Sequence, residues 1–271
     1  MRSERTLKLR QGKHSATSSL VLQTPKVPEV TLAFWVIKVA ATTLGETGGD
    51  ALSMTMNLGY AFSSIVFFTL FLVAEAVQLA SKSFHPFLYW LVIVATTTAG
   101  TTMADFANRS LGIGYFGGSL VLLTVLMAVL GLWRFSLGSV SVNQIVSPKA
   151  EGFYWATILF SNTLGTALGD FFADDSGLGY QGAAMFFAAV LALLVFAYLR
   201  TTISRTWLFW SAFILTRPLG ATLGDLLTKP SAHGGLNLDR ISSTLVIAIF
   251  IAGYILFTSQ RAAHHVGEDL Q

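Results

Sequence analysis

The sequence of 271 residues contains no cysteine and few charged residues, which make up 11% of the chain. The lack of cysteine excludes a disulfide scaffold, thiolate metal sites and thiol catalysis. A soluble domain carries about 25% charged residues, and here 53% of the side chains are apolar and the mean hydropathy is +0.63. This composition excludes an ordinary globular enzyme and predicts a membrane protein with several spans.

Motifs of common enzymes are also missing. The sequence has no glycine-rich phosphate loop followed by Gly-Lys-Ser/Thr, no Gly-x-Ser-x-Gly and no His-Glu-x-x-His. The five histidines are scattered and form no helical pair, so no zinc site is predicted. We therefore expect neither an enzyme nor a bound cofactor. The net charge of +3 comes from lysine and arginine whose positions indicate membrane topology, so it does not predict nucleic-acid binding.

Eight apolar segments follow one another from Val30 onward. Each is long enough to cross a hydrocarbon core of about 30 Å as a helix that rises 1.5 Å per residue. The polar, basic residues 1–29 lack the apolar region of a secretory signal and are predicted to be a cytoplasmic tail, as are residues 261–271. The expected spans within the membrane domain, residues 30–260, are approximately 30–50, 59–80, 86–105, 112–133, 152–170, 179–199, 206–225 and 241–260.

Lysine and arginine are distributed unevenly between the two sides of the expected membrane. The N-terminal tail, three alternate connections and Arg261 hold twelve of the seventeen, and the opposite side is acidic. The positive-inside rule therefore predicts that both termini are cytoplasmic, and the localisation we expect is the bacterial cytoplasmic (inner) membrane.

Four segments, which begin at Trp35, Trp90, Trp155 and Trp210, align without a gap. In each copy a Trp precedes an Asp by fifteen residues, and small residues lie ten and fourteen positions after the Trp. The copies start 55, 65 and 55 residues apart, which indicates two duplicated pairs. The matched small and acidic residues are Gly45, Gly100, Gly165 and Gly220; Gly49, Ala104, Gly169 and Gly224; and Asp50, Asp105, Asp170 and Asp225.

The predicted fold class is an all-α membrane protein of eight transmembrane helices in four tandem two-helix repeats. The repeats lie at about 30–80, 86–133, 152–199 and 206–260. Two-helix repeats keep the same orientation, so we expect a pseudo-symmetry axis along the membrane normal. Small residues four apart share one helix face and let backbones approach closely. The repeated glycines are therefore predicted to be structural, and the repeated Trp residues to anchor the membrane interface.

At these positions the chain resembles a family of bacterial integral membrane proteins built from four tandem two-helix repeats, each with a characteristic Trp. The resemblance covers about residues 30–260 and implies the architecture but no particular activity. A second likeness joins the segment from Gly45 to Asp50 to the Glu-x-Gly-Asp motif of some calcium and manganese exporters. Here the Glu–Asp spacing is one residue longer and the basic residue that follows the motif is absent.

The four repeated Asp residues are the main candidate functional groups. Each lies about 22 Å along its helix from the Trp, which places it in the outer half of the bilayer if the Trp lies in the cytoplasmic aromatic belt. A lone carboxylate there costs about 2.5–3.5 kcal/mol, whereas converging carboxylates suit a hard divalent cation. The predicted metal ligands are Asp50, Asp105, Asp170, Asp225 and Glu46, and the wider substrate site adds Thr101, Thr166 and Arg217.

Local ion pairing is the alternative explanation for these carboxylates. Arg109 and Lys229 stand four residues after the Asp of the second and fourth repeats, one helical turn away. Asp50 and Asp170 have no base at that spacing and are predicted to be the better binding groups.

The sequence favours a secondary transporter or exporter of a small cation, with a divalent metal such as manganese as the first candidate. Two other hypotheses stay open: a permease for a small organic solute, and a non-transporting membrane scaffold. The expected partners are the lipid bilayer and the small cation or solute, without nucleic acid, and self-association is left open. Lys38 and Glu75, on the first two spans, are expected to form an ion pair, with a gate or proton relay as the alternative.

Overall fold

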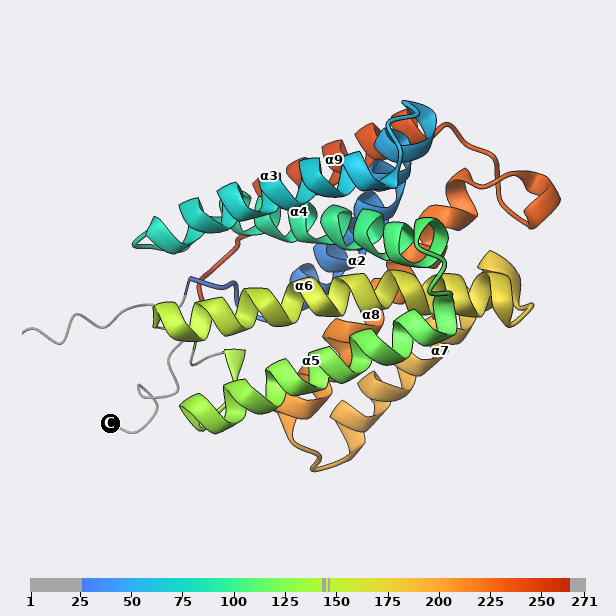
Figure 1. Cartoon of the computed structure of the whole chain (residues 1–271). Helices are drawn as coiled ribbons and strands as arrows, with labels where there is room; N and C mark the ends of the chain where they lie inside the picture. Colours follow the sequence, from blue (N-terminus) through green and yellow to red (C-terminus); the bar gives the residue numbers. More distant parts are fainter. Residues whose placement is uncertain (1–25, 143–144, 146, 264–271) are drawn as a thin grey trace, which may run out of the picture.

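The computed structural model describes residues 26–142, 145 and 147–263. The predicted tails up to residue 25 and from residue 264 lie outside the described residues. Within this part of the chain, eight long α-helices run roughly side by side (Figure 1), and every expected span agrees with one of them to within four residues at each end. The helices are α2 (Leu32–Asp50), α3 (Tyr60–Ala80), α4 (Pro86–Asp105), α5 (Tyr115–Leu137), α6 (Pro148–Asp170), α7 (Gly179–Arg200), α8 (Arg205–Thr228) and α9 (Arg240–Phe257).

Capping residues explain where several helices begin. The side chains of Thr31, Ser147 and Asp239 accept backbone hydrogen bonds at the starts of α2, α6 and α9. Proline occupies the first position of α4 and α6, where a backbone N–H has no intrahelical partner anyway.

The first helix of each repeat belongs to a closed inner ring of α2, α4, α6 and α8. Each inner helix packs against the two inner helices beside it, and α8 completes the ring by packing against α2. The second helices of the repeats, α3, α5, α7 and α9, lie outside this ring. Each outer helix packs mainly against the inner helix of the following repeat: α3 on α4, α5 on α6, α7 on α8, and α9 back on α2. The four repeats therefore interlock in a cycle.

The first glycine of each repeat lies at a contact between neighbouring inner helices. A Cβ at Gly165 would overlap the Arg217 side chain, and a Cβ at Gly100 would lie 2.9 Å from the backbone nitrogen of Thr163. At the same position in the other two repeats, Gly45 faces Thr97 and Gly220 faces Thr42. The spacing of small residues thus lets the inner helices approach closely, as small residues do at membrane helix interfaces.

Five helices of the described chain are long and apolar enough to cross a membrane, judged by length and composition: α3, α5, α7, α9, and α4 with the turn after it. This count is compatible with a membrane protein and is smaller than the eight expected spans. The other three helices, α2, α6 and α8, belong to the inner ring and carry its polar groups. The four outer helices have only 11–17% of their apolar stretches buried, so most of that surface faces outward.

The two ends of the described chain lie together at the Trp end of the bundle (Figure 1). A short antiparallel bridge joins Pro28 to Ala262, and the described residues form no strand beyond it. The Lys26 ammonium lies 2.8 Å from a Glu151 carboxylate oxygen at the start of α6. The bridge attaches the segment before α2 to the segment after α9, and the ion pair attaches it to α6.

Candidate functional site

The four repeated Asp residues form one layer near the same end of the inner ring, here named the acidic layer. Three of them are the last residues of α2, α4 and α6, and a single π-helical turn follows each; the fourth lies in α8. All four residues are at least 97% buried. Carboxylates this deeply buried need cationic or hydrogen-bonding partners. The acidic layer comprises Asp50, Asp105, Asp170 and Asp225.

Two bases bridge the acidic layer in pairs. The Lys229 ammonium lies 2.8 Å from Asp50 and 3.1 Å from the carboxylate of its own repeat. The Arg109 guanidinium lies 2.8 Å from the Asp of its own repeat and 3.7 Å from Asp170. Asp50 and Asp170 have no base four residues later in their own repeat, but each lies beside a base of another repeat. Arg109 comes from the repeat before Asp170, and closure of the ring brings Lys229 of the fourth repeat to Asp50 in the first.

Three carboxylates approach each other most closely. One oxygen from each of Glu46, Asp50 and Asp105 lies within 4.8 Å of the others, and all three side chains are buried. Carboxylate oxygens at such separations can coordinate Mg²⁺, Ca²⁺ or Mn²⁺. Asp170 and Asp225, which the sequence also predicted as ligands, do not belong to this group of three among the described residues.

Arg217 lies next to this group and is completely buried. Its Nη2 atom donates to Glu46 Oε2 (3.1 Å), to Thr166 Oγ1 (2.6 Å) and to Thr101 Oγ1. Thr101 Oγ1 also donates to Glu46 Oε2 (3.2 Å). The structure thus brings together four residues of the predicted substrate site from four inner helices, with Arg217 as the counter-charge of Glu46.

A column of mostly polar side chains continues along the inner face of the ring. On α2 it consists of Lys38, Thr42, Glu46 and Asp50, which are four residues apart, lie on one helix face and are all buried. The residues at the equivalent repeat positions on α8 are Phe213, Arg217, Ala221 and Asp225. The acidic layer is therefore one end of a buried column.

Lys38 occupies the other end of this column. Its Nζ atom lies 3.4 Å from Asn162 Oδ1 and 4.1 Å from the centre of the Phe213 ring. The expected ion pair with Glu75 is wrong, because Glu75 is half-buried on the outer helix α3 whereas Lys38 points into the ring. The Nδ2 atom of Asn162 also donates to Thr96 Oγ1 (3.0 Å).

Beyond Lys38 the ring is closed by aromatic side chains, here named the aromatic cluster. The hydroxyls of Tyr89 and Tyr154 lie 2.5 Å apart, and both rings are buried. The prediction that the repeated Trp residues anchor the membrane interface is wrong for three of them, which are at least 98% buried. The residue before each Trp is also aromatic, a sequence signal that the Trp spacing alone did not reveal. The aromatic cluster comprises Phe34, Trp35, Tyr89, Trp90, Tyr154, Trp155, Phe209 and Trp210.

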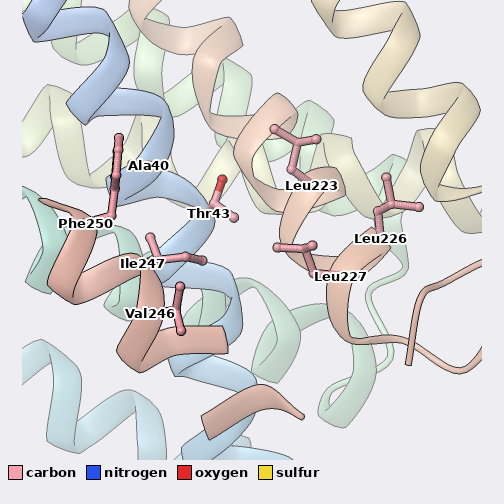
Figure 2. Close-up of a pocket in the computed structure, with 8 residues that line it drawn as sticks. All are labelled: Ala40, Thr43, Leu223, Leu226, Leu227, Val246, Ile247 and Phe250. Carbon is pink, nitrogen blue, oxygen red and sulfur yellow. The ribbon is translucent and has the colours of Figure 1, made fainter. Parts of the chain in front are cut away.

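A pocket of about 370 Å³ lies outside the inner ring, between α2, α8 and α9 (Figure 2). Thr43 contributes the hydroxyl seen among otherwise apolar side chains in this pocket. None of the predicted site residues lines it, so it offers no polar binding groups from the column. Its lining residues are Ala40, Thr43, Leu223, Leu226, Leu227, Val246, Ile247 and Phe250.

Fold and site together define an all-helical protein of four interlocked two-helix repeats, with a charged interior and apolar outer helices compatible with a membrane. The chain belongs to the family described as Repeat of Unknown Function (DUF347), whose model matches it four times, over residues 33–84, 88–138, 153–204 and 208–261. This confirms the resemblance inferred from the repeated Trp. No curated protein and no solved structure matches the chain.

Proposed function

We propose that this protein is a secondary transporter of a small cation, with a divalent metal such as manganese as the first candidate. One observation carries the proposal: oxygens of Glu46, Asp50 and Asp105 lie within 4.8 Å of one another inside the bundle. Oxygen ligands of this kind suit hard divalent cations. Ionisable groups inside a membrane are costly and in general mark ion or substrate pathways.

The proposal includes a position in the bacterial cytoplasmic membrane. All eight helices cross it, both termini are cytoplasmic, and the pseudo-symmetry axis follows the membrane normal. The inner helices need no continuous apolar surface in this arrangement, because the outer helices cover them. The excess of lysine and arginine near the Trp end supports this orientation, so the acidic layer lies toward the outer side.

The proposed path follows the polar column, and the structure has it closed at two levels. Lys229 and Arg109 bridge the acidic layer, and the aromatic cluster fills the opposite end. A cation that reaches Asp50 from outside must displace the Lys229 ammonium, 2.8 Å away. Release on the other side requires the aromatic cluster to part. Alternating access between repeats is the mechanism that fits such a path.

Purified protein in proteoliposomes tests the proposal through Mn²⁺ flux, with Mg²⁺, Ca²⁺ and small organic solutes screened beside it. We expect Asp50→Asn and Glu46→Gln to abolish Mn²⁺ flux, because each removes a negative ligand. Asp175→Asn is the matched control: this exposed side chain lies outside the column, and flux should stay at the wild-type level. Flux of an organic solute alone would favour the permease. If no probe is transported, and Asp→Asn substitutions change only the amount of protein, the result would support the non-transporting membrane scaffold.

A further inference from the structure

Lys38 differs from every other buried charge of the column in having no counter-charge beside it. Each of the five buried carboxylates, Glu46 and the four of the acidic layer, lies within 4.0 Å of a base. Lys38 Nζ instead has an amide oxygen at 3.4 Å and an aromatic face at 4.1 Å, and its side chain is completely buried. Among the described residues, no carboxylate lies within 4.0 Å of it.

The groups around Lys38 do not favour a permanent ammonium. From α8, Arg217 places a second positive charge near it and Phe213 an apolar ring. From α4 and α6 come the neutral Thr96 and Asn162. The α9 side chains against α2, such as Thr244, Ile247 and Phe250, do not titrate. A buried charge without a partner is so costly that such groups readily give up their charge.

The charges of the column make this proton relevant to the acidic layer. Four bases, Arg217, Lys229, Arg109 and Arg240, lie within 4.0 Å of the five carboxylates. If all five carboxylates and these four bases are charged, one negative charge remains, which an ammonium at Lys38 would balance. Lys38 and Glu46 are eight residues apart on α2, about 12 Å along the helix axis. Two positive charges at that separation still repel each other in a medium of low dielectric. A cation that binds to the acidic layer neutralises the negative charge that otherwise stabilises the Lys38 ammonium. Its binding therefore favours loss of the Lys38 proton.

We infer that the Lys38 side chain is the proton-binding site of a cation–proton exchange. It is the ammonium when the acidic layer lacks a bound cation, and it releases one proton to become the neutral amine when the cation binds. The inference rests on the proposed function and adds that the proton is the ion exchanged for the transported cation. The amide oxygen of Asn162 accepts from the ammonium, and both forms of the side chain can remain in the same place.

Proton release on Mn²⁺ binding tests the inference directly. Mn²⁺ is added to the purified full-length protein in weakly buffered detergent solution, and a pH indicator reports the protons released. The wild type should release about one proton for each Mn²⁺ bound, since metal binding and proton loss are linked here. In Lys38→Met, which keeps the length of an apolar stem, Mn²⁺ should still bind while proton release is lost. Glu75→Gln, a titratable group outside the column, is the control that should behave as wild type.

A transport measurement separates coupling from binding. In proteoliposomes a pH gradient should drive Mn²⁺ accumulation by the wild type and not by Lys38→Met or Lys38→Gln, whereas exchange of Mn²⁺ for Mn²⁺ should continue in both variants. Proton release or gradient-driven uptake that survives in these variants would overturn the inference and leave the proposed function intact. Loss of exchange in both variants, with normal thermal unfolding, would also overturn it. A wild type that neither binds nor carries Mn²⁺, Mg²⁺ or Ca²⁺ would overturn the proposed function itself.

Discussion

The two ends of the inner ring are built from equivalent positions of the same four helices, yet different forces hold them. At the aromatic cluster, rings pack edge to face and one pair of hydroxyls meets in the interior. At the acidic layer, two bases each bridge carboxylates of two neighbouring repeats. Closely packed rings fit together in one arrangement. A base that bridges two carboxylates can instead exchange partners or be displaced by another cation. We therefore expect the acidic end to be the more responsive to ions, and the aromatic end to be the more rigid.

The largest effect should come from Arg217, which lies next to the acidic layer. Arg217→Met leaves Glu46 as a buried carboxylate without its base, and breaking a buried ion pair costs about 3–5 kcal/mol. Thermal unfolding in detergent would measure this loss of stability. The double variant Glu46→Gln with Arg217→Met should recover much of it. Equal instability of the single and double variants would show that Arg217 acts through its contacts with Thr101 and Thr166 instead.

The close approach of inner helices between the two ends can be tested at Gly165. Its Cβ would overlap the buried Arg217 side chain, so Gly165→Ala should cost about 1–3 kcal/mol through overpacking. The matched control is Gly131→Ala on the outer helix α5, where a Cβ meets nothing within 4 Å. That variant should be neutral or slightly stabilising in the same unfolding assay. Similar midpoints for the two variants would contradict the packing described for the ring.

At the aromatic end, Tyr89→Phe should cost about 1–2 kcal/mol, because the buried Tyr154 hydroxyl loses its partner. Removing both hydroxyls should cost less than removing one, since no polar group is then left unpaired. Unfolding midpoints of the two single variants and the double variant would decide this. Salt should change none of these differences, because the contact involves no charge. If the differences in unfolding midpoint depended clearly on salt, the aromatic cluster would not differ from the acidic layer in being held without charges.

The smallest effect is expected for Arg109, whose side chain is 30% exposed. Water and salt reach this guanidinium, so the cost of removing it is smaller than for the completely buried Arg217 and falls as salt screens the pair. Arg109→Gln should therefore lower the unfolding midpoint slightly at low salt, with a difference that shrinks as salt rises. Lys229→Gln, at 9% exposure, should show a larger and less salt-sensitive change. The reverse order would mean that burial does not control the strength of these bridges.

The order and extent of the helices could be predicted from the sequence, because apolar length and the Trp–Asp spacing are local signals. The bases that Asp50 and Asp170 meet from other repeats could not. Lys229 and Asp50 are 179 residues apart, and only closure of the ring brings them together. The i,i+4 rule found the two pairs within a helix and missed the two between repeats. The sequence grouped Arg217 with Thr101 and Thr166 in one site. The hydrogen bonds among them could not be predicted, because they join different inner helices.

The repeated Trp residues show a different limit. Aromatic side chains are enriched both at membrane interfaces and in packed interiors, so residue type alone did not distinguish the two. The aromatic residue that precedes each Trp, as Tyr89 precedes Trp90, was the available signal for a packed cluster. Lys38 was correctly placed on the first long helix, α2, but its partner was chosen from the adjacent helix. The packing of α3 on the next repeat takes Glu75 away from it.

The packing of α9 on α2 has a consequence for biosynthesis. The helix α9 of the fourth repeat covers α2 of the first, and Asp50 meets Lys229 only once the fourth repeat has been made. During synthesis the acidic residues of α2 therefore remain without these partners until the fourth repeat is present. A chain that stops after three repeats lacks α8 and α9 and cannot close the inner ring. Assembly of the ring therefore requires all four repeats.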